Sequence, residues 1–170
     1  MPINKKLKNA AIGILVLLVL IQFYRPERNL SNDDTYAISK KYPVPDSVQT
    51  ILKASCYDCH SDKTVYPWYA NVQPVSAWLT HHINEGKEHF NFSEFLSYPV
   101  NKQHHVIQGM RKAIKNDEMP IKSYTLIHTY ARLSPEQKTM LCKWADGIAA
   151  SMEASYPADS LIWKGRKHRD

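Results

Sequence analysis

The pentapeptide Cys56-Tyr57-Asp58-Cys59-His60 constrains this chain more than any other feature. It reads C-x-x-C-H, the pattern through which c-type haem is attached to proteins. Cysteines three residues apart lie on one face of a helical turn, so both sulfurs can reach the vinyl groups of one porphyrin. His60 follows Cys56 by one turn, so its imidazole can bind the iron. The pattern predicts covalent haem c on Cys56 and Cys59, with His60 as an axial ligand.

Three other interpretations of the two cysteines compete. A thioredoxin-like redox pair requires a strand-helix-strand setting, which the surrounding sequence does not show. Structural zinc requires a second pair of ligands, and the candidates are the adjacent pairs His81-His82 and His104-His105. The third is an ordinary disulfide with a histidine beside it by chance. Covalent haem explains His60 as well as both cysteines, so it is the reading we favour.

The first 24 residues indicate a membrane anchor. Lys5, Lys6 and Lys8 precede the apolar run AAIGILVLLVLIQF at residues 10–23, as in signal sequences. No small-x-small cleavage site follows, so we expect an uncleaved signal anchor; a cleaved signal is the alternative. The lysines keep the N-terminus in the cytoplasm. We therefore expect a single pass through the inner membrane, with the haem domain in the periplasm, where bacteria attach c-type haem.

The net charge of +6 resides at the two ends of the chain. Three lysines lie in residues 1–8, and four basic side chains and one acidic lie in residues 164–170 (KGRKHRD). The residues between carry equal numbers of basic and acidic side chains. This distribution excludes a DNA-binding face, and we expect no nucleic-acid partner. The tail is expected to be a solvated end, with weak contact to anionic lipid as the alternative.

The rest of the chain predicts one small all-α domain. We expect a polar linker at residues 25–45, because prolines interrupt it and no apolar period is sustained. A haem domain at residues 46–156 and a basic tail at 157–170 follow. Helices are expected over DSVQTILKAS (46–55), with Asp46 as cap and Cys56 directly after it, from Pro74 to about Lys87, and from about Lys102 to Asn116. A last helix is expected to begin at Ser134, with Gln137 completing a capping box.

Met119-Pro120, after the third of these helices, suggests a second iron ligand. Proline holds Met119 in extended backbone and cannot continue a helix, so the thioether is presented from a stiff loop. A methionine opposite a histidine raises the reduction potential. A methionine that merely fills the core is the plain alternative. The competing sixth ligands are His82, His81 and His128, and an open site is a further alternative; His89, His104, His105 and His168 look exposed.

Taken in order, several short motifs resemble the bacterial haem-binding domain family, small C-x-x-C-H proteins similar in style to cytochrome c. The resemblance covers roughly residues 40–152. It rests on Cys56–Ser61, Tyr66-Pro67-Trp68-Tyr69, Gln73-Pro74-Val75, Trp78, Gly86, Asn91-Phe92-Ser93, Met119-Pro120, Tyr124, His128, Leu133-Ser134, Glu136 and Trp144. The resemblance implies covalent haem on Cys56 and Cys59 with His60 axial, and Met119 less firmly. It implies no particular reaction.

Three further expectations concern the surroundings of the haem. The aromatic cluster Tyr66, Trp68, Tyr69 and Trp78 either packs beside the cofactor or donates to a propionate. A backbone carbonyl near Pro67 or Pro74 is expected to accept the Nδ1 proton of His60. Cys142, in the last predicted helix, is expected to be a buried and inert thiol.

These observations predict a membrane-anchored, periplasmic mono-haem cytochrome that carries electrons between redox partner proteins. We expect no enzymatic activity and no catalytic residue. A haem sensor or a peroxidase-like enzyme is the alternative, and it requires an exchangeable sixth ligand. A structural metal-binding module without a redox role is a third class.

Overall fold

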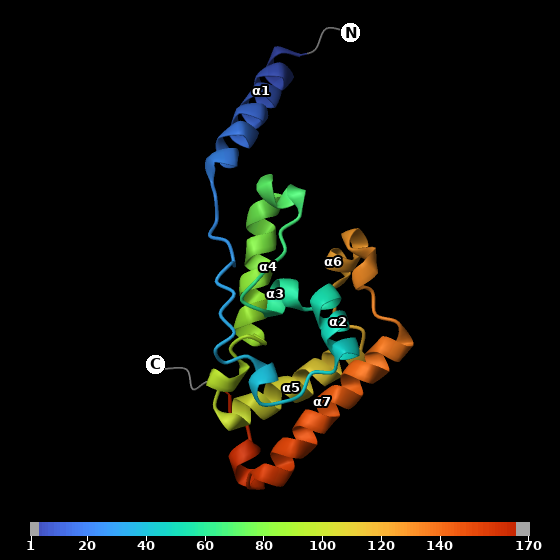
Figure 1. Cartoon of the computed structure of the whole chain (residues 1–170). Helices are drawn as coiled ribbons and strands as arrows, with labels where there is room; N and C mark the ends of the chain where they lie inside the picture. Colours follow the sequence, from blue (N-terminus) through green and yellow to red (C-terminus); the bar gives the residue numbers. More distant parts are fainter. Residues whose placement is uncertain (1–3, 166–170) are drawn as a thin grey trace.

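The structure, a computed structural model, describes residues 4–165. In this range all regular elements are helical (Figure 1), which confirms the predicted all-α class. The last residues of the basic tail, 166–170, and His168 with them, lie outside the described residues. The elements in chain order are α1 (Lys5–Leu20), η1 (Ile21–Phe23), η2 (Ile38–Lys40), α2 (Asp46–Ser55), α3 (Tyr57–His60), η3 (Trp68–Asn71), α4 (Val75–His89), η4 (Phe95–Ser97), α5 (Val100–Lys115), α6 (Lys122–Ile127), η5 (Thr129–Ala131), α7 (Pro135–Ser155) and η6 (Ala158–Leu161).

The four expected helices of the domain are present as α2, α4, α5 and α7. The start of α7 follows the expected capping box: the Ser134 hydroxyl accepts from the backbone N–H of Gln137, and the Gln137 side chain accepts from that of Ser134. At α2 the expectation was wrong by one residue. Pro45 occupies the capping position and Asp46 is the first helical residue, where its carboxylate favours the helix dipole.

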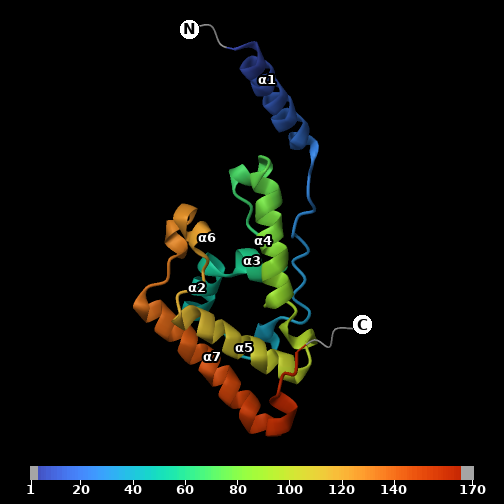
Figure 2. The same ribbon diagram turned by 180° about the vertical axis from the view of Figure 1, so that it is seen from behind.

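The main core lies where α2 meets the pair α5 and α7, which run side by side in both views (Figures 1 and 2). Its most deeply buried side chains are Ile38, Val48, Leu52, Phe95, Ile107, Ile114, Leu141, Ala145 and Met152. A second, smaller cluster beneath α4 joins Ala70, Leu79 and Ile83 to Cys59 and Tyr66. The C-x-x-C-H segment therefore lies between two apolar clusters: Cys56 and Tyr57 pack against the main core, and Cys59 packs against the smaller one.

The segment expected as a linker packs on the domain. Ile38 and Tyr42 are 2% and 5% exposed and belong to the main core. Asn29 donates its backbone N–H to the Tyr66 hydroxyl and its amide to the carbonyl of Ser61. The domain boundaries stay a prediction. The segment is not a flexible linker, however, because Ile38 and Tyr42 pack in the core and Asn29 is hydrogen-bonded to the domain.

The N-terminal helix stands apart from the other helices in both views (Figures 1 and 2). Lys5–Phe23, which combines α1 and η1, is 19 residues long and apolar enough to cross a membrane. Residues 5–20 are exposed, and only Ile21 and Gln22 at its end are half-buried. A signal sequence near the N-terminus would have the same length and composition. At the other end of the chain, η6 packs on α5 and buries Leu161.

Candidate haem site

The C-x-x-C-H motif forms a turn of its own. Helix α2 ends at Ser55, and Cys56 leaves helical geometry with φ −131°. The carbonyl of Cys56 then accepts the backbone N–H groups of Cys59 at 3.2 Å and His60 at 3.0 Å, which starts α3. Both cysteines are free thiols. This turn brings the two thiols and the imidazole together on one short segment.

The imidazole of His60 is held by the segment after α4. Its Nδ1 lies 2.8 Å from the carbonyl oxygen of Phe90, so Nδ1 carries the proton and donates it. The backbone N–H of Phe92 donates in turn to the carbonyl of His60 at 2.8 Å. This arrangement leaves Nε2 with a free lone pair, as an iron ligand requires. Burial also lowers the pKa of His60, and the hydrogen bond to Phe90 offsets this only in part, so the ring is neutral at pH 7.

The prediction of which carbonyl accepts the Nδ1 proton of His60 was therefore wrong. We expected a carbonyl near Pro67 or Pro74, and the structure uses Phe90. Pro67 and Pro74 flank η3, and Gln73 beside them bonds to the end of the apolar helix instead. The physical reason is the course of α4, which carries the chain back past α3 and delivers Phe90 beside His60.

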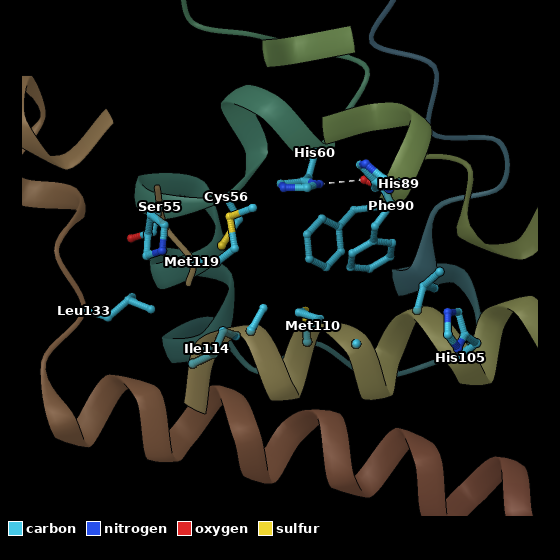
Figure 3. Close-up of a pocket in the computed structure, with 15 residues that line it drawn as sticks. Ser55, Cys56, His60, His89, Phe90, His105, Met110, Ile114, Met119 and Leu133 are labelled. Atoms are coloured by element: carbon cyan, nitrogen blue, oxygen red, sulfur yellow. Dashed lines mark hydrogen bonds between the residues drawn. The ribbon is translucent and has the colours of Figure 1, made fainter. Parts of the chain in front are cut away.

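An apolar cavity of about 270 Å³ opens beside His60 (Figure 3). Figure 3 shows His60 on one side of it, Met110 and Ile114 of α5 on the opposite side, and Met119 next to Cys56. Its lining is Ser55, Cys56, His60, His89, Phe90, Phe92, His105, Val106, Gly109, Met110, Ala113, Ile114, Met119, Pro120 and Leu133. A second cavity of about 490 Å³ shares six of these residues and adds Cys59. The two cavities are adjacent, because they share these residues; Cys56 and His60 line both, and Cys59 lines the second.

The loop that carries Met119 is fixed at both ends. At its start Asp117 adopts φ 59°, and the carbonyl of Ala113 accepts the N–H groups of Glu118 and Met119. After it, the Tyr124 hydroxyl donates to the carboxylate of Asp58 at 2.8 Å. Asp58 lies between the two cysteines, so this bond ties the loop to the C-x-x-C-H turn. Met119 is 39% exposed and lines both cavities together with Cys56 and His60.

The histidines considered as alternative ligands occupy different places. His82 lines the larger cavity and lies against Trp78. The Nε2 atom of His81 lies 3.4 Å from a carboxylate oxygen of Glu85. The ligand atoms of His81, His82 and Glu85 lie within 4.8 Å of one another and could hold a metal ion, but this group does not include the cysteines. The pairing of His81-His82 with Cys56 and Cys59 in one zinc site is therefore not favoured.

His128 is engaged elsewhere. Its Nε2 lies 2.5 Å from the hydroxyl of Tyr69, its Nδ1 lies 2.7 Å from that of Tyr130, and its ring stacks on Tyr124. With both ring nitrogens hydrogen-bonded and the ring outside both cavities, His128 supports the Met119 loop through Tyr124.

Two cavity residues were not singled out by the sequence. His89 was expected to be exposed, and it is, yet it lines both cavities at the end of α4. Met110 was expected as a core residue of its helix, and it presents a second thioether to the smaller cavity. The spacing of Met110 within its helix was the only available signal, and it indicates a buried face without indicating what that face covers.

The four residues of the aromatic cluster have different surroundings: some pack against neighbouring side chains, and Trp68 is exposed. Tyr66 packs with Cys59 against the small cluster, and Trp78 borders His82. Tyr69 is tied to His128, and Trp68 is 78% exposed. None of the four lines either cavity, so a propionate donor among them is not favoured. Cys142 is only partly buried, with its sulfur 3.8 Å from the carbonyl of Arg111.

A buried ion pair stabilises the surroundings of the turn. Asp62 is largely buried, and its carboxylate accepts from Lys87 of α4 at 2.7 Å and from the amide of Asn91 at 2.9 Å. Lys87 also donates to the side chain of Asn29 at 2.7 Å. These contacts join the residues after His60 to α4 and to the segment containing Phe90, which holds the imidazole.

The residues at this site fit a haem on chemical grounds. Burial raises the pKa of Cys56 to about 12 and that of Cys59 to about 11, so both remain protonated thiols. The cavity offers apolar side chains to a flat macrocycle, one neutral imidazole with a free Nε2, and the thioether of Met119. This donor set matches the ligands that proteins use for haem iron.

Comparison with known proteins gives one match. The model of a haem-binding domain family matches residues 16–147. No curated protein and no solved structure matches the chain. The matched range includes the end of the apolar helix and the segment expected as a linker, which agrees with the packing of Ile38 and Tyr42 in the core. Because the match covers well over half of the chain, this protein belongs to the haem-binding domain family.

Proposed function

We propose that this protein is a membrane-anchored c-type cytochrome that carries one electron at a time on a single covalent haem. The observation that carries the proposal is the bond from His60 Nδ1 to the Phe90 carbonyl. It leaves Nε2 available in a cavity that Cys56 and Met119 also line. The family match supports haem binding itself.

In the proposed attachment, Cys56 and Cys59 each add their S–H across the carbon-carbon double bond of one vinyl group. The sulfur bonds to one vinyl carbon and the proton goes to the other, so nothing is released and no external oxidant or reductant is required. The short turn from Cys56 to His60 holds both thiols next to the axial imidazole. When bound, haem supplies an iron that alternates between Fe(III) and Fe(II).

We propose Met119 as the sixth ligand. Its backbone is held by the Ala113 carbonyl, and the Tyr124–Asp58 bond fixes the chain beyond it. A ligand on a restrained loop loses little conformational entropy when it binds. A thioether opposite an imidazole favours Fe(II) and raises the potential, which suits electron transfer.

We further propose that Lys5–Phe23 spans the inner membrane and that the haem domain faces the periplasm. The length and apolar composition of this helix support the span, and Lys5, Lys6 and Lys8 before it support a cytoplasmic N-terminus. Redox partner proteins would then meet the domain outside the membrane.

One observation favours a second candidate, a haem sensor or peroxidase-like enzyme. Met119 is 39% exposed, so it is the kind of ligand that a small molecule can displace. His89, which lines both cavities, would then be a candidate acid or base. We rank this second, because the Met119 loop is bonded on both sides.

The test uses the full chain, expressed with the haem-attachment machinery. Haem on the wild type should resist acid-acetone extraction, and its reduced pyridine complex should show two saturated vinyl positions. The variant Cys56→Ala with Cys59→Ala should lose all extraction-resistant haem, whereas Cys142→Ala should keep it. Covalent haem on the double variant would refute the proposal. The mature protein should also fractionate with membranes and keep its N-terminus; a soluble protein beginning near residue 25 would refute the anchor.

A further inference from the structure

The end of the apolar helix is bonded directly to the start of α4. The Gln22 side chain accepts the backbone N–H of Gln73 at 3.0 Å and donates to its carbonyl at 3.2 Å. The Gln73 side chain donates to the carbonyl of Tyr24 at 2.8 Å and accepts from the N–H of Ala77 in α4. Gln73 is 5% exposed. These bonds place the residues around Gln73 beside the point where the helix ends.

Two arginines extend this connection. Arg25 donates to the carbonyl of Asn71 at 2.8 Å, and Arg28 donates to the Asn71 side chain at 2.5 Å. Arg28 also lies over the ring of Tyr66, 4.9 Å from its centroid. Residues 24–28, which follow η1, therefore do not separate the domain from the helix. They hold η3 and the start of α4 against it, as the views of Figures 1 and 2 agree.

The edge of the domain that is held there is apolar and exposed. Trp68, Val72 and Val75, which we call the rim, are 78%, 44% and 37% exposed. They lie on either side of Asn71 and Gln73, the two residues that bond to the helix end. Phe23, the last residue of η1, is 80% exposed. Single exposed apolar residues are ordinary on a protein surface, but these lie beside the end of a helix whose apolar side chains are exposed from Leu7 to Leu20.

We infer that the rim lies in the headgroup region of the bilayer and seats the haem domain on the membrane surface. This inference rests on the proposed span of Lys5–Phe23. If that helix is in lipid, its hydrogen bonds to Gln73 put the rim at the level where the helix leaves the membrane. Tryptophan favours that level, because its ring is apolar and its N–H is polar. Arg25 and Arg28 at the same level carry the charge that lipid phosphates attract.

We favour the bilayer over a protein as the partner of the rim, because a membrane-spanning helix already places lipid next to the rim. A helix in the membrane brings lipid to the rim without a second binding event, whereas a protein would have to displace that lipid. The consequence is a fixed orientation: α4 begins at the membrane and carries Gly86 and His89 away from it, towards the haem-binding turn.

The experiment uses the full-length holoprotein in protein-free vesicles of phosphatidylethanolamine and phosphatidylglycerol. These contain a phosphatidylcholine with a photoactivatable diazirine near the headgroup end of one acyl chain. After illumination, mass spectrometry locates the label. We expect label on residues 5–23 and on residues 68–75, and none on α7. Label on residues 5–23 without label on the rim overturns this inference and leaves the anchor intact. No label on either overturns the anchor, and the inference with it.

Variants then separate the rim from its neighbours. Trp68→Glu should remove most of the rim label, because a carboxylate avoids the apolar boundary, while the label on residues 5–23 and the covalent haem stay unchanged. Ile162→Glu, a matched change at an exposed apolar residue beyond η6, should change neither. Gln22→Ala should reduce the rim label severalfold with the rim itself intact. A rim that takes no lipid label in vesicles, but is shielded from a water-soluble labelling reagent in native membranes, would indicate a membrane protein as its partner. That result would overturn the lipid assignment.

Discussion

Gly86 and Cys59 contact each other through their backbones. A Cβ at Gly86 would lie 2.5 Å from the carbonyl oxygen of Cys59 and 3.1 Å from its Cβ. Helix α4 therefore packs on the turn from Cys56 to His60 at a distance that only glycine permits. Because α4 continues to Phe90, this contact also sets where the carbonyl that holds His60 lies.

Gly86→Ala should therefore displace α4 from the turn. We expect a loss of about 1–3 kcal/mol in the free energy of unfolding, as for other overpacked sites, and a lower yield of covalent haem. Denaturant unfolding and the ratio of haem to protein measure the two effects. The control is Gly147→Ala in α7, where a Cβ meets nothing within 4 Å; it should be neutral or stabilise by about 0.5–1 kcal/mol. Equal behaviour of the two variants would contradict the argument.

The thiols of Cys56 and Cys59 should be slow to alkylate in the folded apoprotein. Burial raises their pKa values to about 12 and about 11, and only the thiolate is nucleophilic. At pH 8, Cys56 should react with iodoacetamide roughly a thousandfold more slowly than a free cysteine. Its rate should rise about tenfold for each pH unit up to its pKa. Mass spectrometry of the Cys56 peptide follows the reaction, and the same chain in denaturant is the control, which should react at the ordinary rate.

Met119→Ala should open the sixth position of the iron and leave the haem attached. The reduction potential should fall, because a thioether that favours Fe(II) is lost, and carbon monoxide should bind faster than to the wild type. Met110→Ala is the matched control, because it removes a thioether from the same cavity without touching the loop. It should change neither property. If Met110→Ala opens the site instead, the ligand comes from α5. If His82→Ala or His128→Ala does so, the protein is a bis-histidine cytochrome.

The ion pair between Asp62 and Lys87 should contribute far more to stability than an exposed pair. Lys87→Met leaves the carboxylate of Asp62 buried without its cation, which should cost about 3 kcal/mol. Lys138→Met removes the partner of the exposed Asp117 and should cost less than about 1 kcal/mol. Thermal unfolding of both variants checks the difference. Similar losses of stability in the two variants would show that water solvates the carboxylate of Asp62.

The residues that were predicted correctly are those with local signals. The capping box of Ser134 and Gln137 involves four consecutive residues. The turn that joins Cys56 to Cys59 and His60 is equally local, although Cys56 itself lies outside the helix. The Phe90 carbonyl is different. It is a backbone atom thirty residues from His60, and only the length and packing of α4 determine its position, so no side-chain pattern indicates it.

The role of residues 25–45 was hidden for a related reason. Ile38 and Tyr42 are buried, but they stand among polar residues without a helical or alternating period, and periodicity is what reveals a buried face. The position of His89 at the cavity could not be predicted for a different reason. It is exposed as expected, and its exposure says nothing about the cavity that it borders.

The packing of Ile38 and Tyr42 decides where a soluble fragment of this protein can begin. A fragment starting at Asp46 would lack both side chains, and the core beneath α2 and η4 would open to water. Removing one large buried side chain costs about 2–5 kcal/mol, and a whole domain is stable by only about 5–15 kcal/mol. Such a fragment would also lose the bond from the Asn29 side chain to the carbonyl of Ser61, the residue after His60. A fragment that folds and retains haem should therefore begin before Asn29, directly after the apolar helix.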